Sequence, residues 1–335
     1  MTVNHYDTGK WFSIFKAYHF KTMHITREAR LTGHTGPVYA LEESGLHDSF
    51  FSGGGDGIVA EWDFNALDEG QLITKVADPI YSLFHHREQN LLLIGQSGGG
   101  IHFLNLDSRT EERLIKLHNA PVFDLKFSKK HNLLFSLAGN GMLGVTYLKD
   151  MTHLETMKIC EGKLRSAALN ADESILAIGC GQGTVLFYSL PGLNPLGELQ
   201  AHKPGYSVYA VVFSPDNRCL VTGARDAHLN IFDVNDNYSR INSIPAHNYS
   251  IYSIVFSPDK KHIATCSRDK TVKIWNADNF NVIERIDKEK YDAHINSVNK
   301  LLWHSFTKKL VSAGDDQSIM VWDVRMGDRV SADIY

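Results

Sequence analysis

Histidine, a hydroxyl residue and aspartate recur in this chain as sets with a nearly constant spacing. Together these residue types can build a nucleophilic triad, in which the imidazole takes the hydroxyl proton and the carboxylate orients the imidazole. The complete sets are His34 with Ser52 and Asp56, His202 with Thr222 and Asp226, His247 with Thr265 and Asp269, and His294 with Ser312 and Asp316. A catalytic set should be singular, whereas these sets recur at equivalent positions. The pattern therefore favours a structural role, and we predict that the protein is not an enzyme.

The sets belong to a repeat that covers nearly the whole chain. Each repeat ends on one tip residue, a fixed distance after the aspartate position. The tips are Trp62, Leu104, Thr146, Tyr188, Phe232, Trp275 and Trp322, at intervals of 42, 42, 42, 44, 43 and 47 residues. A period of this length predicts a repeat architecture with seven units. In the second repeat the polar residues are absent together, at Val76, Ile94, Gly98 and Leu104, which avoids an unpaired buried polar group.

Within a repeat, short apolar segments alternate with turns. The stretch from Ala293 to Asp323 contains three such segments, separated by a polar break and by a turn at Asp315 and Asp316. Each segment has the length and composition of a short strand. Phe-Ser-Pro-Asp at 213–216 and again at 256–259 is typical of a turn, because proline pre-sets φ. Residues 23–31, just ahead of the first repeat, alternate apolar and polar side chains and predict one further strand.

These linked positions resemble those of the WD-repeat family, whose repeats open on Gly-His and close on Trp-Asp, as 33–34 and 62–63 do here. The resemblance covers about residues 31–323 and implies an all-β fold, a single seven-bladed β-propeller of four-stranded antiparallel blades. It also implies that the aspartate accepts from the histidine, the histidine bonds the hydroxyl, and the hydroxyl meets the indole of Trp62, Trp275 or Trp322. The last repeat supplies only three strands, so the strand at 23–31 should complete blade seven and remove an open sheet edge. We expect an N-terminal extension at 1–22, the propeller at 23–325 and a tail at 326–335.

The resemblance further places one residue of each repeat at the mouth of the central channel, on the top face of the ring. These residues are Tyr39, Tyr81, Phe123, Arg165, Tyr209, Tyr252 and Asn299. Two explanations of the aromatic members are open, since the rings either pack against one another or form a binding hot spot. Tyrosine combines contact area with a polar hydroxyl. We therefore predict that a protein or peptide partner binds at this mouth.

Arginine marks one sector of the same face. The residue before the turn aspartate is small in the first four repeats, but it is Arg225 in the fifth and Arg268 in the sixth. Together with Arg165, these residues predict an acidic or phosphorylated partner segment, because guanidinium groups suit carboxylates and phosphates. The alternative is that each arginine stacks on its own tyrosine or pairs with an acid such as Asp315.

Composition and the remaining motifs narrow the function classes. A net charge of −4 gives no general attraction to nucleic acid. Cys160, Cys180, Cys219 and Cys266 lack ligand spacing, so they predict a reducing compartment rather than a disulfide framework or a zinc site. The glycines at 95–100 lead into a strand, not a helix, so they predict a turn and not a phosphate loop. We expect no metal, no cofactor and no membrane span, and a monomeric propeller acting within a complex in the cytoplasm, with the nucleus not excluded.

Two further segments leave alternatives open. Trp11, Ile14, Phe15 and Tyr18 have helical spacing and indicate either a short amphipathic helix or a packed or poorly ordered tail. The tetrapeptide 322–325 matches the Trp-Asp-x-Arg box of substrate receptors of cullin-type ubiquitin ligases, which makes such a receptor the alternative function. A propeller enzyme with an active site in the channel is the third candidate. It would need an acid–base pair there, and none is evident.

Overall fold

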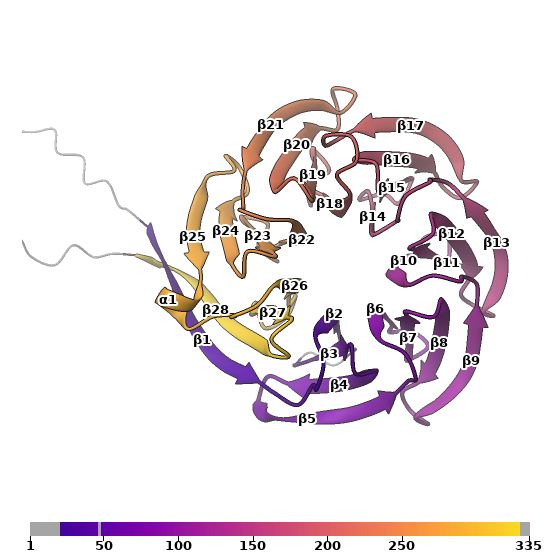
Figure 1. Ribbon diagram of the computed structural model, residues 1–335, viewed down its shortest axis with the longest axis horizontal. Helices are drawn as coiled ribbons and strands as arrows, with labels where there is room; N and C mark the ends of the chain where they lie inside the picture. The colour runs from indigo at the N-terminus through magenta and orange to yellow at the C-terminus, as the bar shows by residue number, and fades with distance from the viewer. Residues whose placement is uncertain (1–20, 46–47, 329–335) are drawn as a thin grey trace, which may run out of the picture.

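Seven four-stranded antiparallel sheets form a closed ring around a central axis in the computed structural model, which describes residues 21–45 and 48–328 (Figure 1). Each sheet is one blade. In blades one to six the strands run in chain order from the centre to the circumference, and in blade seven the N-terminal strand of the chain is the outermost. The all-β, seven-bladed propeller expected from the sequence is confirmed.

The blades follow one another in chain order. Blade one consists of β2 (Val38–Glu43), β3 (Ser49–Gly54), β4 (Ile58–Asp63) and β5 (Ala66–Lys75), and blade two of β6 (Ile80–His86), β7 (Leu91–Gln96), β8 (Gly100–Asn105) and β9 (Thr110–Lys116). Blade three consists of β10 (Val122–Ser128), β11 (Leu133–Ala138), β12 (Met142–Tyr147) and β13 (Thr152–Lys158), and blade four of β14 (Ser166–Leu169), β15 (Ile175–Gly179), β16 (Thr184–Ser189) and β17 (Asn194–Gln200). Blade five consists of β18 (Val208–Phe213), β19 (Cys219–Ala224), β20 (His228–Asp233) and β21 (Ser239–Pro245), and blade six of β22 (Ile251–Phe256), β23 (His262–Ser267), β24 (Val272–Asn276) and β25 (Val282–Ile286). Blade seven consists of β26 (Val298–Trp303), β27 (Leu310–Gly314), β28 (Ile319–Asp328) and β1 (Lys21–Leu31).

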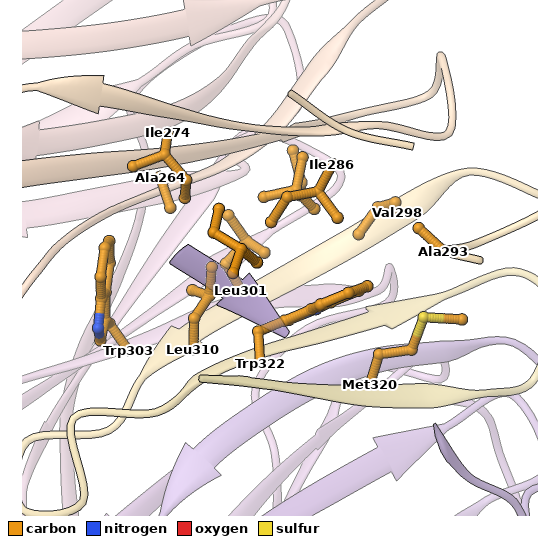
Figure 2. Close-up of a cluster of buried hydrophobic side chains, with 13 residues drawn as sticks. Ala264, Ile274, Ile286, Ala293, Val298, Leu301, Trp303, Leu310, Met320 and Trp322 are labelled. Carbon is orange, nitrogen blue, oxygen red and sulfur yellow. The ribbon is translucent and has the colours of Figure 1, made fainter. Parts of the chain in front are cut away.

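Burial falls from the middle of each blade to its edge. The second strands β3, β7, β11 and β23 are buried along their whole length, because adjacent blades cover both of their faces. The outermost strands, such as β17 and β21, are almost wholly exposed. The cores therefore lie between blades. Figure 2 shows the core between blades six and seven, where Ala264 and Ile274 of blade six face Leu301, Leu310 and Trp322 of blade seven.

The N-terminal strand closes the ring. β1 pairs antiparallel with β28 along its length, from Lys21 opposite Asp328 to Leu31 opposite Ile319. Ile25 and Leu31 are buried and the side chains between them alternate with exposed ones, which is the period of a strand with one covered face. The predicted closure of blade seven is confirmed. The strands run beyond the expected bounds of 23 and 325, and the helical pattern predicted for the segment ahead of them lies outside the described residues.

One helix was not predicted. Among the described residues the only helix is α1 (Lys288–Tyr291), between β25 and β26. The Asp287 side chain accepts from the Lys290 amide and caps its start, and Asp292 closes its end in the left-handed conformation. This insertion accounts for the longest interval in the repeat. Arg27 of β1 bonds the Asp292 carboxylate at 2.7 Å, so the insertion is tied to the closing strand.

The prediction that the cysteines form no disulfide is wrong for one pair, because Cys160 and Cys180 are joined as a disulfide. Cys160 occupies the position of the opening histidine in blade four, and Cys180 occupies the position of Gly54 in blade one. A Cβ added at Gly54 would lie 2.7 Å from Nδ1 of His34, and one added at Gly314 would lie 2.9 Å from Nδ1 of His294, so these two positions adjoin in blades one and seven as well. The repeat therefore brings two distant cysteines together without any cysteine spacing motif. Cys219 and Cys266 are free thiols.

Candidate functional site

The polar sets form closed hydrogen-bond chains inside blades one, six and seven. In blade seven, His294 Nδ1 lies 2.9 Å from the Asp316 carboxylate and Nε2 lies 2.9 Å from Ser312 Oγ. The indole of Trp322 donates to the same oxygen at 2.9 Å. The same pattern joins His34, Ser52, Asp56 and Trp62 in blade one, and His247, Thr265, Asp269 and Trp275 in blade six. Ionised aspartate only accepts, so Nδ1 carries the proton and Nε2 accepts from the hydroxyl.

Blade five keeps the chain without its tryptophan. His202 bonds Asp226 at 3.0 Å and Thr222 at 2.8 Å, and Phe232 replaces the indole. In all four complete sets the hydroxyl residue has no exposed surface. These hydroxyls cannot meet a substrate, so their geometry is structural.

In blade six, electrostatics favour a neutral imidazole at His247 and an ionised carboxylate at Asp269. Burial raises the pKa of the Asp269 carboxyl, but hydrogen bonds from His247, Thr271 and the backbone of Asn248 outweigh it and hold that pKa below its usual range. Burial also lowers the pKa of His247, although the hydrogen bond to Asp269 opposes the shift. Burial also raises the pKa of Asp316, but hydrogen bonds from His294 and Ser318 outweigh it, so the pKa of this carboxyl lies below its usual range.

Blade three has an incomplete chain. His118 Nε2 lies 2.8 Å from Ser136 Oγ, but the buried Nδ1 has no hydrogen-bond partner in the part of the chain that the structure describes. The reason is that the Asn140 amide turns to Asn119, at 2.6 Å, and not to the imidazole. Burial lowers the pKa of His118 to about 4, with a smaller contribution from the charge of His153.

The seven mouth positions all line one cavity of about 720 Å³ that follows the central channel. Their rings touch in sequence around the mouth. Tyr39 stacks on Tyr81 at 4.8 Å between centroids, Tyr81 meets Phe123 edge-on at 5.3 Å, and Tyr209 meets Tyr252 edge-on at 5.2 Å. Mutual packing is therefore present, and the same rings bound an open cavity.

Arg165 closes the gap between two aromatic arcs. Its Cζ lies 4.2 Å from the centroid of Phe123 and 4.8 Å from that of Tyr209, so the guanidinium is held between two rings. Among the residues that the structure describes, the buried Nε has no hydrogen-bond partner. Burial lowers the pKa of this arginine, but guanidinium remains charged at any physiological pH. The cation is thus positioned by stacking and has free donors.

The other two arginines lie on the top face, which is the face that carries the opening histidines and the turn aspartates. Arg225 and Arg268 are exposed, and Arg268 lies 5.8 Å above the ring of Tyr249 rather than against Tyr252. Asp315 is bonded to Asn299 at 2.7 Å. Within residues 21–45 and 48–328 neither arginine forms an ion pair, so the alternative of pairing with Asp315 is not what the structure contains.

Sequence reasoning missed three side chains beside these arginines. Tyr206, Tyr249 and Ile295 are 40%, 58% and 47% exposed, and each follows the opening histidine of its blade in the loop before the first strand. They follow their histidines by four, two and one residues, so no single repeat position marks them in the sequence. They give the top face over blades five to seven an apolar component next to its cations.

The residues of the other candidate motifs bond to or pack against neighbours within the propeller. Arg325 pairs with Asp323 at 2.7 Å on β28, and the Trp322 side chain is fully buried in its hydrogen-bond chain. His85 bonds Asn90 at 3.1 Å and His86 packs edge-on against Phe127. In the described part of the chain, no group of three or more histidine, cysteine or acidic side chains is placed to hold a metal ion. No helix there is long and apolar enough to cross a membrane.

Comparison with known proteins agrees with this geometry. The family model described as WD domain, G-beta repeat, matches residues 25–63, 193–233, 238–276 and 287–323. These segments contain the inner strands of blades one, five, six and seven, the four blades with complete polar sets. The solved WD40 β-propeller domain of Doa1 superposes with a TM-score of 0.78 at 16% identity, over 91% of this chain and 97% of that one.

The curated relatives match shorter parts of this chain and are longer than it. A periodic tryptophan protein 2 homolog of Caenorhabditis elegans is 23% identical over 35% of this chain, and its mouse counterpart is 25% identical over 32%. WD repeat-containing protein 55 of Rattus norvegicus is 26% identical over half of this chain. These matches span 13%, 12% and 44% of the relatives' own lengths, so the chain covers less than half of each.

The fold and the repeated hydrogen-bond chains define a closed propeller with a channel. Four repeats of this chain match the WD-repeat family model, and the whole ring has the fold of a WD40 β-propeller domain. Propellers of this class generally act as scaffolds for protein partners.

Proposed function

We propose that this propeller captures an acidic or phosphorylated segment of a partner protein on its top face, over blades four to six. The observation that carries the proposal is the set of three guanidinium groups on consecutive blades, Arg165, Arg225 and Arg268, none of which has a carboxylate partner among the described residues. Charge-assisted bonds to such groups are among the stronger polar contacts.

The neighbouring side chains fit the same purpose. Tyr249 is exposed beside Arg268, and Ile295 is exposed where its backbone amide donates to Asp316. Aromatic residues next to arginine are typical of interface hot spots. The mouth residues Tyr209 and Tyr252 supply a rigid rim, because their rings already pack on each other. A partner segment with an acidic group flanked by apolar residues would complement this surface.

Charge reversal tests the proposal. Affinity purification with mass spectrometry, together with arrays of acidic and phosphorylated peptides, should show loss of capture for the double variant Arg225→Glu with Arg268→Glu. The matched control is Arg30→Glu with Lys116→Glu, which changes the net charge equally at exposed positions of outer strands. Undiminished capture by the first variant, or equal loss in both, would contradict the assignment of this face.

A further inference from the structure

Three cationic side chains face the central channel from three different blades. Arg165 precedes β14, Lys126 belongs to β10 and Lys300 belongs to β26, and all three line the 720 Å³ cavity. Within residues 21–45 and 48–328 none of these side chains has a hydrogen bond to an acceptor or an ion pair. A partly buried cation without such a partner lacks compensation for the water it has lost.

The acids near the channel are engaged elsewhere or are weakly ionised. Asp124 accepts from the backbone amide of Ala167 at 2.9 Å, and Asp315 accepts from Asn299 at 2.7 Å. Glu42 of β2 feels the charges of both lysines, yet burial raises its pKa to about 7, so it is only partly ionised at neutral pH. None of these carboxylates lies at ion-pair distance from the three cations.

The two lysines line the same cavity, Lys126 from blade three and Lys300 from blade seven. The charges of both lysines act on the carboxyl of Glu42. Arg165 lines this cavity as well, held between two rings. The cavity has the volume of an ordinary small-molecule site, which runs from about 300 to 1,000 Å³.

We propose that the central channel is a binding site for a compact polyanion of the phosphate class, held by Arg165 together with Lys126 and Lys300. The guanidinium offers a fork of donors and the ammonium groups offer point charges, a combination that matches several phosphate oxygens at once. This site lies inside the ring and uses two lysines that take no part in the proposed capture of a partner on the top face. The phosphate belongs either to a free small molecule or to a phosphorylated side chain that enters the channel.

The test uses the full chain with pyrophosphate as the probe, by titration calorimetry at fixed ionic strength. We expect the variant Lys126→Met with Lys300→Met to lose at least about tenfold in affinity, because two cations that contact the anion are removed. Methionine keeps the apolar stem of each lysine. The matched control Lys116→Met with Lys261→Met removes two exposed surface lysines and should bind as the wild type does.

Two further arms separate the source of the phosphate and keep the two proposals apart. Pyrophosphate affinity that survives Arg225→Glu with Arg268→Glu supports a channel site for free ligands. A phosphoserine peptide that binds where pyrophosphate does not, and that loses affinity in the channel variant, supports entry of a partner's side chain. Equal affinity of the channel variant and the wild type for both probes would overturn the proposal, as would no binding of either. Thermal unfolding of each variant checks that it is folded.

Discussion

At the scale of single residues, the hydrogen-bond chains should hold individual blades. We predict that Asp269→Ala lowers the free energy of unfolding by about 1–3 kcal/mol, because it leaves a buried donor of His247 without its acceptor. Asn248 and Thr271 also lose their bonds to this carboxylate. Chemical denaturation followed by tryptophan fluorescence measures the change.

The choice of control depends on the structure. Gly98→Ala removes no polar bond, but its new Cβ would approach the Asp78 carboxylate at 2.5 Å, so a clash would confuse the comparison. Asn140→Ala is the better control, since it removes bonds to Asn119 and to the Met142 amide but none to the imidazole of blade three. An Asp269→Ala midpoint as high as that of wild type would show that the chain contributes nothing to stability.

His118 should make stability depend on pH. Its pKa is about 4 in the folded protein against an ordinary 6.5, so the unfolded chain binds more protons between these values. The contribution is fully present above about pH 6.5 and is lost as pH falls toward 4. We predict that His118→Gln, measured by urea denaturation at pH 7, 6 and 5, shows a smaller decline in unfolding free energy than wild type. Parallel pH profiles for the two proteins would exclude this role.

At the scale of elements, β1 closes the ring by completing blade seven. β1 pairs with β28 and links through Arg27 to the insertion at α1 and through Glu28 to Lys309. Deleting residues 1–31 exposes the edge of β28, so we predict aggregation or loss of cooperative unfolding. Deleting residues 1–20 alone leaves the paired strand intact and should be milder. Size-exclusion chromatography with thermal unfolding distinguishes the two, and a monomeric 1–31 deletion of wild-type stability would count against the closure.

At the scale of the whole molecule, the residues proposed to bind a partner lie apart from the cores that stabilise the ring. Arg225 and Arg268 are exposed on turns outside the inter-blade cores, so their reversal to glutamate should leave the melting temperature near that of wild type. Tyr39 lies across the channel from them, stacked on Tyr81. We predict that Tyr39→Ala weakens partner capture less than the double reversal does, as measured by recovery in affinity purification. Equal losses would indicate a site that uses the entire mouth.

The sequence by itself determined the ring. A period near 42 residues and the recurring polar positions predicted seven blades, because these signals are local and are repeated. The resemblance to the WD-repeat family added their internal bonds and the closure by the spare strand ahead of Gly33. The same register named the residues that line the channel. The polar chains could be anticipated because donors and acceptors of one blade lie within one repeat.

Tertiary structure decided the contacts that depend on side-chain direction, even where both residues belong to one repeat. The sequence pattern did not indicate that Cys160 meets Cys180, that Arg268 covers Tyr249, or that Asp315 bonds Asn299. The unpaired state of Lys126 and Lys300 likewise follows from what three separate blades place around one channel. Such contacts depend on where each blade directs its side chains after the ring has closed. Single-position patterns carry no information about that direction, because a lysine facing a channel and a lysine facing water have the same local sequence.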